Sequence, residues 1–489
     1  MNIFRKLEIY KPNKAQLFLG ILLIASPWIL LFITTNIIVH HSVFDSVPCW
    51  SDELAYWHEI LSFSQKGFNF GYYTVDEALP SYLSFGSHGF GTISIYALFG
   101  KIFGWKAYSM VIVNAFLMSS AYLFLILITK ISSKKLLYIL IFSLTYTPLI
   151  LFSSTSMTEL LNYSVLIAYV GMLYAYFKQG GKNLLVVLIL FCTAISFIRI
   201  IYIVLFLPVF FKRKDEFKFD NKFLIYVVFW IFLSVVLFFL NNLFVSPYPE
   251  SFLNKLLASM DFFDFIINFA IHFLQNTWNF LNPFSENIIQ VLERYFVILV
   301  CLVSLIKSNL LQTRFKKIKI EYFVVFLILF LFLLINIAGY DVFDWRDYRV
   351  MSPVLFGCVL FLLLNNTYSV VRSSLIINLI GLILLIMSPQ IPESFNQNRY
   401  EKPVENKMLN RIEFTENPSS RFENTIVVQQ FNKNTVLNIP AGIGINYSEV
   451  LSDKLKSNYL FSEYKLKLST YKIIDSNETG YLYQKIFLH

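Results

Sequence analysis

The sequence predicts an all-α polytopic membrane protein with about 11 transmembrane helices and a small C-terminal extracytoplasmic α/β domain. Three observations predict this fold class. The 489 residues are 56% hydrophobic and only 15% charged, whereas a soluble domain averages roughly 25% charged residues. Long apolar runs recur along the chain, and about 20 residues are enough to cross a ~30 Å hydrocarbon core. After Pro389 the composition turns polar, which indicates a separate domain.

The first apolar run, Leu17–Val39, follows a basic N-terminal segment. It is longer than the apolar part of a typical signal peptide, so we interpret it as a retained membrane anchor. The other basic residues lie mainly in short loops between apolar runs, and the positive-inside rule then places the N-terminus in the cytoplasm. This placement accounts for the net charge of +9 without a nucleic-acid partner.

The remaining apolar runs alternate between the two sides of the membrane. The run Leu184–Phe211 has basic residues at both ends, so we interpret it as a hairpin of two short helices with Arg199 near its tip. Counting the hairpin as two spans places the C-terminus outside. The other expected spans are Ala107–Thr129, Leu136–Phe152, Leu160–Phe177, Phe223–Val245, Ile288–Ile306, Tyr322–Ala338, Val350–Leu364 and Leu375–Met387.

Two domains follow from this reading. Residues 1–389 form the transmembrane region, which includes a long outer loop at 40–106, and residues 390–489 form the soluble domain. In the latter, alternation of apolar and polar side chains at Thr425–Val428 and Tyr481–Ile486 predicts strands.

Several ionisable residues follow the first span, within Ser51–Glu59. If this segment is helical, Asp52, Tyr56 and Glu59 share one face, at spacings of i, i+4 and i+7. Glu53 lies on the neighbouring face. Carboxylates at the boundary between membrane and water suit chemistry on a substrate with a polar head and a lipid tail. The alternative is an ordinary helix N-terminus, where the helix dipole favours acidic residues.

Three more polar residues stand out beside or within apolar runs. His88 lies between small residues in Ser87–Gly91, and Glu159 immediately precedes a span. Arg199 interrupts an apolar run, where a charge at mid-membrane depth costs about 2.5–3.5 kcal/mol. The alternatives are a hydrated turn for His88, a favourable helix-terminal charge for Glu159, and interaction with lipid headgroups for Arg199.

The segment Asp341–Pro353 places Arg346 and Arg349 among three aspartates at the outer end of a span. The rigid donor fork of arginine matches a phosphate group, so both residues are candidates for phosphate binding. The alternative is a local network of salt bridges at the interface.

Together these features resemble the GT-C superfamily of glycosyltransferases, membrane enzymes that include protein mannosyltransferases and lipid A aminoarabinose transferases. The resemblance covers about residues 1–390 and depends on short motifs. The Lys-Pro-Pro pattern of some members is absent. The matching positions are the first-loop acidic pair Asp52-Glu53, the second acidic residue Glu159, the hairpin arginine Arg199, and Arg349–Pro353 for a late Arg-Tyr-x-x-Pro motif in which Val350 replaces the aromatic residue.

The resemblance implies an inverting glycosyltransferase that moves a sugar from a polyprenyl-phosphate donor to an extracytoplasmic glycan or lipid acceptor, such as an O-antigen or a cell-wall polymer. It also implies a bacterial inner membrane as the location. Asp52 would be the base, with Glu53 beside it in the catalytic pair. The implied ligand contacts are Arg199, Arg349 and Arg346 on the donor phosphate, and Glu159, His88, Tyr56 and Glu59 on the sugar or acceptor.

The spacing of the acidic residues predicts no metal site, and it leaves a Mg²⁺ or Mn²⁺ ion at the carboxylates open. Two other functions also remain open. A lipid-linked glycan transporter or flippase often shows inverted repeats, and we find none. An oligosaccharide polymerase or ligase relies on outer-loop arginines, and the acidic segment around Asp52 argues against it.

Overall fold

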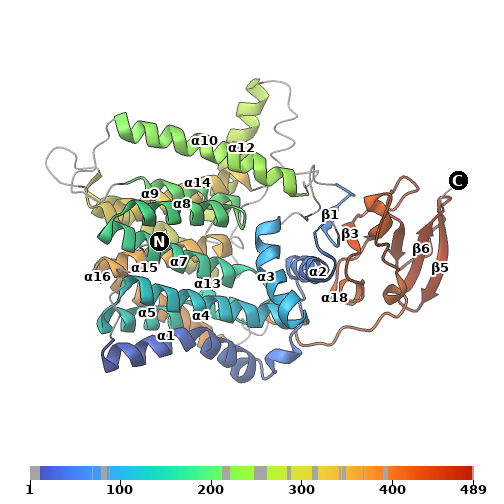
Figure 1. The fold of residues 1–489 in the computed structure, drawn as a ribbon, viewed down its shortest axis with the longest axis horizontal. Coiled ribbons are helices and arrows are strands. Elements are labelled where there is room, and N and C mark those ends of the chain that lie inside the picture. The colour runs from blue at the N-terminus through green and yellow to red at the C-terminus, as the bar shows by residue number, and fades with distance from the viewer. Residues whose placement is uncertain are drawn as a thin grey trace. The chain divides into compact units, whose positions relative to one another are not determined.

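A computed structural model describes most of the chain, and the described residues form two compact units (Figure 1). The first unit comprises Met1–His40, Asn114–Val235 and Ser251–Asn396, and the second comprises His41–Val113, Val236–Glu250 and Gln397–His489. The described residues are 12–68, 70–78, 85–86, 89–211, 221–246, 262–282, 288–310, 318–340, 343, 348–366, 368–388 and 395–486.

The first unit is a bundle of apolar helices, and α4 and α10 contribute residues to both units. Within the described residues, seven helices are long and apolar enough to cross a membrane, and four further apolar helices are shorter. A mostly helical polytopic membrane protein is thus confirmed, while the number of about 11 spans stays a prediction. Apart from η4 and α9, whose bounds are given below, the described helices of the bundle are α1 (Lys14–Phe32) with its continuation η2 (Ile33–Ile38), α4 (Ser109–Thr129), α5 (Ser133–Thr145), α6 (Thr147–Phe152), α7 (Glu159–Gln179), α8 (Lys182–Ser196), α10 (Asn221–Phe244), α12 (Phe262–Leu281), α13 (Ile288–Lys307), α14 (Ile320–Gly339), α15 (Tyr348–Leu364) and α16 (Tyr368–Met387).

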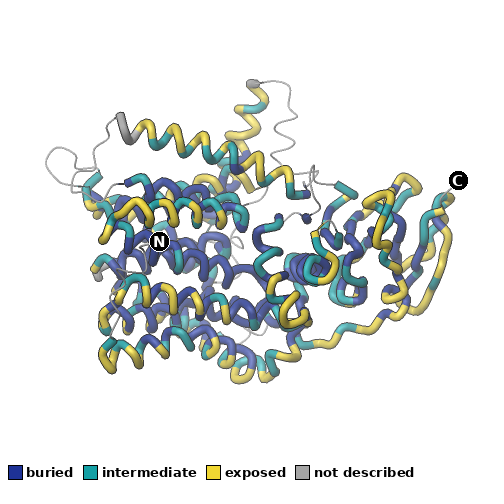
Figure 2. The backbone as a smooth tube through the Cα atoms, viewed as in Figure 1, coloured by how far each residue is buried: buried dark blue, intermediate teal, exposed yellow. Residues whose placement is uncertain are grey.

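Helices α7 and α15 form the core of this bundle, and Figure 2 shows both as buried along nearly their whole length. Pro353 lies inside α15 and has no N–H to donate to the carbonyl of Arg349 four residues earlier. The Ser352 hydroxyl donates to that carbonyl instead, at 3.0 Å. A proline is therefore tolerated inside a buried helix because its neighbour satisfies the freed acceptor.

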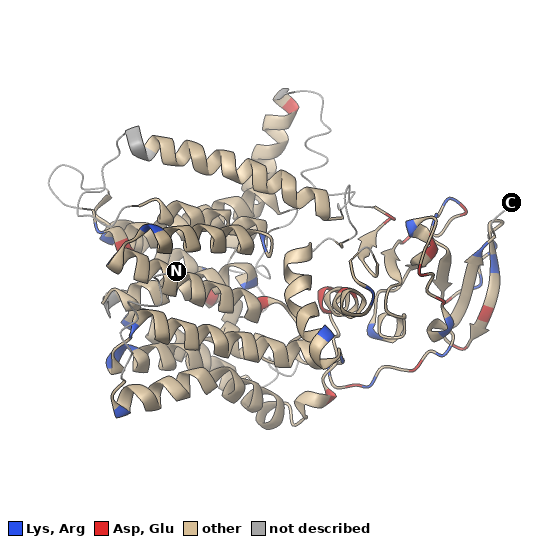
Figure 3. Cartoon of the chain, viewed as in Figure 1, with Lys and Arg blue, Asp and Glu red and all other residues tan. Residues whose placement is uncertain are grey.

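Basic residues gather at one end of the bundle. Gln16 at the start of α1 donates to the carbonyl of Ile131 between α4 and α5, at 3.0 Å, and Lys135 at the start of α5 donates to the carbonyl of Leu364 at the end of α15. Figure 3 shows this end in blue, whereas the helices are tan along most of their length. Spans that alternate in direction predict that the start of one helix lies beside the end of another, and these contacts agree with that prediction. The basic residues at these ends are Lys14, Lys130, Lys134, Lys135, Lys178, Lys182, Lys307 and Lys319.

The hairpin predicted within Leu184–Phe211 is confirmed. Helix α8 ends at Ser196, and the chain returns as η4 (Ile200–Leu205) and α9 (Phe206–Val209). Arg199 lies at the tip in an extended conformation, with φ −144°. The carbonyl of Leu205 accepts a hydrogen bond from the Tyr169 hydroxyl at 2.8 Å, which fastens the returning arm to α7.

The second unit contains a six-stranded sheet in the order β1-β3-β2-β4-β6-β5. The pairs β1–β3, β3–β2 and β2–β4 are parallel, and β4–β6 and β6–β5 are antiparallel. The strands predicted at 425–428 and 481–486 correspond to β2 and β6. The bounds are β1 Tyr73–Val75, β2 Thr425–Val428, β3 Gly444–Tyr447, β4 Tyr459–Ser462, β5 Tyr471–Asn477 and β6 Gly480–Lys485.

Strand β1 comes from the outer loop, not from the C-terminal segment. It pairs with β3 in the register Tyr73↔Ile445. Helix α2 (Ser51–Lys66) of the same loop places Leu54 in the core formed with residues of β2 and β3, such as Ile426. The outer loop and the C-terminal segment therefore share one hydrophobic core. The sequence predicts that the loop belongs to the transmembrane region, and the predicted domain boundary at 389/390 lies outside the described residues.

The turn after β1 is fixed by Glu77. Asp76 and Glu77 both adopt positive φ, at 49° and 55°, a conformation that costs roughly 1–2 kcal/mol for residues other than glycine. The Glu77 carboxylate accepts hydrogen bonds from the backbone N–H of Lys456 at 2.9 Å and of Ser457 at 2.7 Å. It also accepts one from the Ser457 hydroxyl at 2.6 Å. These charge-assisted bonds offset the backbone strain and hold β1 at the edge of the sheet.

Replacing Glu77 with alanine should destabilise the second unit by about 2–4 kcal/mol, because three donors lose a charged acceptor. Chemical denaturation of the full chain in detergent, with hydrogen exchange of β1 and β3, measures the effect. Asp76→Ala is the matched control, since Asp76 is exposed and has a similar φ. Equal effects of the two substitutions would contradict this role for Glu77.

Candidate functional site

In the first unit, the end of the bundle away from the basic residues carries an ion pair. Glu159 begins α7, whose other end carries Lys178. A guanidinium nitrogen of Arg199 lies 3.5 Å from Glu159 Oε1. The Glu159 side chain is fully buried, whereas the Arg199 side chain is 22% exposed. Two residues predicted to act at one site are thus in contact.

Polar side chains surround this pair. The Tyr202 hydroxyl donates to Asn162 Oδ1 at 2.7 Å, which joins the hairpin to α7. The Tyr163 hydroxyl lies 2.9 Å from Ser352 Oγ, and the Tyr146 hydroxyl donates to the Ser352 carbonyl at 2.9 Å. Asn162 and Tyr163 follow Glu159 by one turn of helix, so α7 presents a polar first turn within an apolar bundle.

Arg349 belongs to the same region through Tyr348, the first residue of α15. The Tyr163 hydroxyl of α7 lies 2.9 Å from Ser352 Oγ, so the first turn of α15 lies beside the first turns of α7. Glu293, Glu159 and Arg349 are each within electrostatic range of the Tyr348 hydroxyl. Arg349 is half-buried. We call this group, Glu159, Arg199, Glu293, Tyr348 and Arg349, the Glu159 cluster. It includes Glu159, Arg199 and Arg349, which are three separate candidates from the sequence.

Three buried polar atoms of this cluster have no hydrogen-bond partner among the described residues: Glu159 Oε2, Glu293 Oε2 and the Tyr348 hydroxyl. A buried polar group left in this state costs about 1–3 kcal/mol, more if it is charged. Most buried polar groups in proteins are satisfied by protein or by water. Two acceptors and one hydroxyl in a small region can therefore hydrogen-bond a hydroxyl-rich ligand or water.

Glu293 and Tyr348 are absent from the sequence prediction. Glu293 is 3% exposed and lies within α13, one of the candidate spans. The rule that selected Arg199, a charge interrupting an apolar run, also applies to Glu293. Its neighbour Arg294 has a different role, because its guanidinium donates to the carbonyls of Phe280, at 2.7 Å, and Asn282, at 3.0 Å, at the end of α12.

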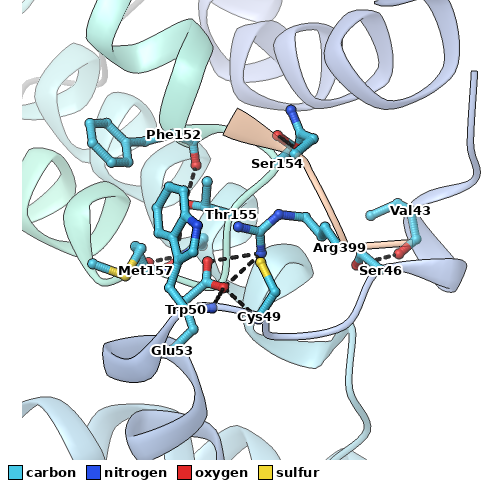
Figure 4. Close-up of polar contacts among 12 residues, drawn as sticks. Val43, Ser46, Cys49, Trp50, Glu53, Phe152, Ser154, Thr155, Met157 and Arg399 are labelled. Atoms are coloured by element: carbon cyan, nitrogen blue, oxygen red, sulfur yellow. Dashed lines mark hydrogen bonds and ion pairs between the residues drawn. The ribbon is translucent and has the colours of Figure 1, made fainter. Parts of the chain in front are cut away.

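In the second unit, Glu53 forms a fully buried ion pair with Arg399 (Figure 4). Arg399 Nη1 lies 2.8 Å from Glu53 Oε1 and 2.9 Å from Oε2. The backbone N–H groups of Cys49 and Trp50 donate to Glu53 Oε2 at 2.9 and 3.2 Å, so Glu53 also caps the start of α2. The Arg399 guanidinium lies 5.2 Å from the centre of a Trp50 ring. Both oxygens of Glu53 are thus engaged in structural contacts.

The rest of α2 confirms the predicted helix. Asp52 is half-buried in the first turn, and Tyr56 is 7% exposed one turn later. The two lie on one face, as their spacing predicts.

Further along α2, two ionisable side chains point into the second unit. His58 Nε2 donates to the carbonyl of Ile443 at 2.7 Å, and burial lowers the pKa of His58 to about 4. Glu59 Oε1 accepts from the N–H of Tyr73 at 2.9 Å, and the side chain lines a small cavity with Phe63 and Phe85. Burial raises the pKa of Glu59 to about 8. Both side chains are therefore neutral over much of the range near pH 7, and Glu59 bonds the backbone of β1.

The candidates thus divide between the two units. The second unit holds Asp52, Glu53, Tyr56 and Glu59, and the first holds Glu159, Arg199 and Arg349. His88 and Arg346 lie outside the described residues. Among the residues that the structure describes, no three His, Cys, Asp or Glu side chains come together as metal ligands. A Mg²⁺ or Mn²⁺ ion stays a prediction.

Substituting Glu53 by alanine should destabilise the second unit by about 3–5 kcal/mol, because Arg399 would remain buried and unpaired. Replacing Glu53 and Arg399 together by methionine should cost less than the single change, since no charge is then left buried. Chemical denaturation of each variant gives the comparison. Glu401→Ala serves as the control, because Glu401 pairs with Lys433 at the surface, where ion pairs contribute under ~1 kcal/mol. A Glu53→Ala cost no larger than that of the control would refute the structural role.

The raised pKa of Glu59 should make stability depend on pH. Its pKa rises from an ordinary value of 4.5 to about 8 on folding, so the folded state binds more protons between these values. The contribution of Glu59 to stability is then fully present below about pH 4.5 and is lost as the pH rises through about 8. Glu59→Gln, which stays neutral, should flatten this fall. Unfolding midpoints measured from pH 5 to 8 test it, and identical profiles for the two proteins would count against it.

Comparison with known proteins adds two structural neighbours. No protein-family model and no curated protein matches the sequence. The chain is similar to the apo form of the Archaeoglobus fulgidus oligosaccharyltransferase, with 11% identity, a TM-score of 0.49 and coverage of 95% of this chain and 70% of that chain. It is also similar to AglB from Archaeoglobus fulgidus in complex with an inhibitory peptide and a dolichol-phosphate, with 10% identity, a TM-score of 0.46 and coverage of 92% and 69%. At this identity and TM-score the likeness assigns no reaction or residue to this chain.

Proposed function

We propose that this protein is an inverting membrane glycosyltransferase that moves a sugar from a polyprenyl-phosphate donor to a glycan or lipid acceptor. The Glu159 cluster carries the proposal. It places an arginine that is partly exposed, a second arginine and two buried carboxylates at one end of a bundle whose helices are otherwise apolar. A lipid-linked substrate needs this combination, because its tail is apolar and its reacting headgroup is charged.

The proposed reaction needs positively charged groups beside the donor phosphate, which is the leaving group. A sugar linked to a polyprenyl phosphate leaves behind a phosphate monoester anion, so the leaving group needs charge stabilisation more than protonation. Preorganised donors aimed at developing charge are usually the largest catalytic contribution. Arg199 would supply such donors, because its guanidinium is oriented by Glu159 and remains partly exposed. Arg349 would supply the second set.

The buried acceptors suit the sugar itself. Glu159 Oε2, Glu293 Oε2 and the Tyr348 hydroxyl, unpaired among the described residues, would hydrogen-bond sugar hydroxyls and fix the ring over the departing phosphate. Holding reacting groups in one geometry contributes several kcal/mol to a rate. The role of base stays with Asp52, since Glu53 beside it is engaged with Arg399. One base that takes a proton from the acceptor hydroxyl contributes about 10²–10⁴-fold.

The location also belongs to this proposal. Under the positive-inside rule, the basic end of the bundle faces the cytoplasm, and the Glu159 cluster then faces the opposite side of the membrane. A bacterial inner membrane provides polyprenyl-phosphate sugars on that side, together with O-antigen or cell-wall glycans as acceptors.

The test is transfer from radiolabelled polyprenyl-phosphate sugars by membranes that contain the protein. Arg199→Gln and Arg349→Gln should each lower kcat by about 10²–10³-fold, the cost of losing one charge-stabilising donor. Asp52→Asn should lower it by about 10²–10⁴-fold. Adding EDTA and then Mg²⁺ or Mn²⁺ in the same assay tests for a metal requirement.

Arg372→Gln is the matched control. Arg372 is exposed near the start of α16, so its loss should leave the rate unchanged. Transfer that survives in both cluster variants at the control rate would refute the assignment of the phosphate site. Transfer that is lost in these variants but persists in Asp52→Asn would remove Asp52 as the base and leave the phosphate site intact.

A further inference from the structure

The sheet of the second unit contains a topological switch point. The segment after β2, which includes Val436, packs in the core cluster that contains Ile426 and Val428. The segment after β3, which includes Leu455, packs in a different cluster, with Val427. Successive residues of a strand point to opposite faces of its sheet, so the two connections cross on opposite faces. The chain order therefore reverses between β2 and β4, and ligands of open α/β sheets bind outside the carboxyl ends of strands at such points.

A pocket of ≈ 320 Å³ lies at this point of the sheet. Its volume is near the lower end of the range for small-ligand sites, about 300–1,000 Å³. It is formed by side chains at the carboxyl ends of the three adjacent parallel strands. These are Gln429 and Gln430 after β2, Tyr447 and Glu449 at the end of β3, and Ser462, Glu463 and Tyr464 at the end of β4.

Hydrogen bonds hold the planar polar groups in place. Gln430 Nε2 donates to Glu463 Oε2 at 2.8 Å. The Ser462 hydroxyl donates to Gln429 Oε1 at 3.3 Å, and Gln429 Nε2 donates to the Glu449 carbonyl at 3.2 Å. An amide has two donors and two acceptor lone pairs, and a carboxylate has about four acceptor sites. The same groups therefore keep hydrogen-bonding capacity for a ligand.

The charged side chains that line the pocket favour some classes of ligand over others. Glu449 and Glu463 are the charged side chains among the described residues that line the pocket. Two carboxylates disfavour phosphate or carboxylate ligands by repulsion. Tyr464 is 72% exposed, so its ring offers an apolar surface beside the polar groups. A flat ring next to amides and carboxylates fits a molecule with hydroxyl groups on its edge and C–H groups on its face.

We propose that this pocket binds one sugar residue of a neutral glycan. The Tyr464 ring packs against the C–H face of the sugar, and Gln429, Gln430 and Glu463 hydrogen-bond its hydroxyls. Binding at this pocket does not require the reaction proposed above, because every residue named here belongs to the C-terminal part of the second unit.

Saturation-transfer NMR and calorimetry on the full chain in detergent test the proposal. The ligands are neutral di- to tetrasaccharides that contain glucose, galactose, mannose or N-acetylglucosamine. At least one series should bind, and Tyr464→Ala and Gln430→Ala should each weaken binding roughly tenfold, the effect of one lost contact of average strength. Tyr464→Phe keeps the ring and should bind as the unmodified chain does. Glu478→Gln, an exposed residue in the turn between β5 and β6, is the control.

The proposal fails if no oligosaccharide of the set binds, or if binding is equal in Tyr464→Ala and Glu478→Gln. It also fails if spermidine binds in place of every sugar, since the pocket would then be a cation site. The transfer assay separates this outcome from the proposed reaction. Sugar binding that persists in Asp52→Asn alongside absent transfer supports the pocket alone, and transfer without sugar binding overturns the pocket alone.

Discussion

The ion pair between Glu53 and Arg399 is the interaction on which the second unit depends most. Taking two charges out of water costs several kcal/mol per ion, and a close geometry with further hydrogen bonds is needed to offset it. Glu53 meets this condition by accepting from Arg399 and from two backbone amides. The pair fixes the first turn of α2 against a segment more than 340 residues away in the sequence. His58 and Glu59 on the same helix then reach Ile443 and the N–H of Tyr73, so one helix connects the outer loop to the sheet.

In the first unit, hydrogen bonds between neutral side chains offset the cost of burying polar groups. Its helices satisfy most of their hydroxyl groups internally, as in the bonds of Tyr202 to Asn162 and of Tyr163 to Ser352. Glu159, Glu293 and Tyr348 each have one buried polar atom without a hydrogen-bond partner among the described residues, and so do a few other side chains of the bundle, such as Asn378. Glu53 and Glu159 both match family motifs in the sequence, and each lies buried beside an arginine. Both oxygens of Glu53 are engaged, whereas Glu159 Oε2 has no hydrogen-bond partner among the described residues.

The sequence predicts those features whose cause is local. A run of apolar residues is sufficient to predict a span, and basic flanks around Leu184–Phe211 with a single arginine inside predict the hairpin. Spacing within α2 places Asp52 and Tyr56 on one face. The features that sequence reasoning missed depend on distant partners. Strand β1 has three residues, too few to show an alternating pattern. Arg399 lies in a polar segment typical of a surface, and nothing near it in the sequence shows that Glu53 is its partner.

The parallel pairing of β1 with β3 has a consequence for biosynthesis. Ile445 is translated about 370 residues after Tyr73, its partner in the ladder. At typical rates of 5–20 residues per second the interval is roughly 20–70 s, during which the ribosome produces every helix of the bundle from α4 to α16. Throughout that time the early edge strand lacks its neighbour and exposes open backbone groups to other chains. Assembly of the sheet is therefore a late, post-insertion event, and the nascent loop needs protection until the C-terminus is released.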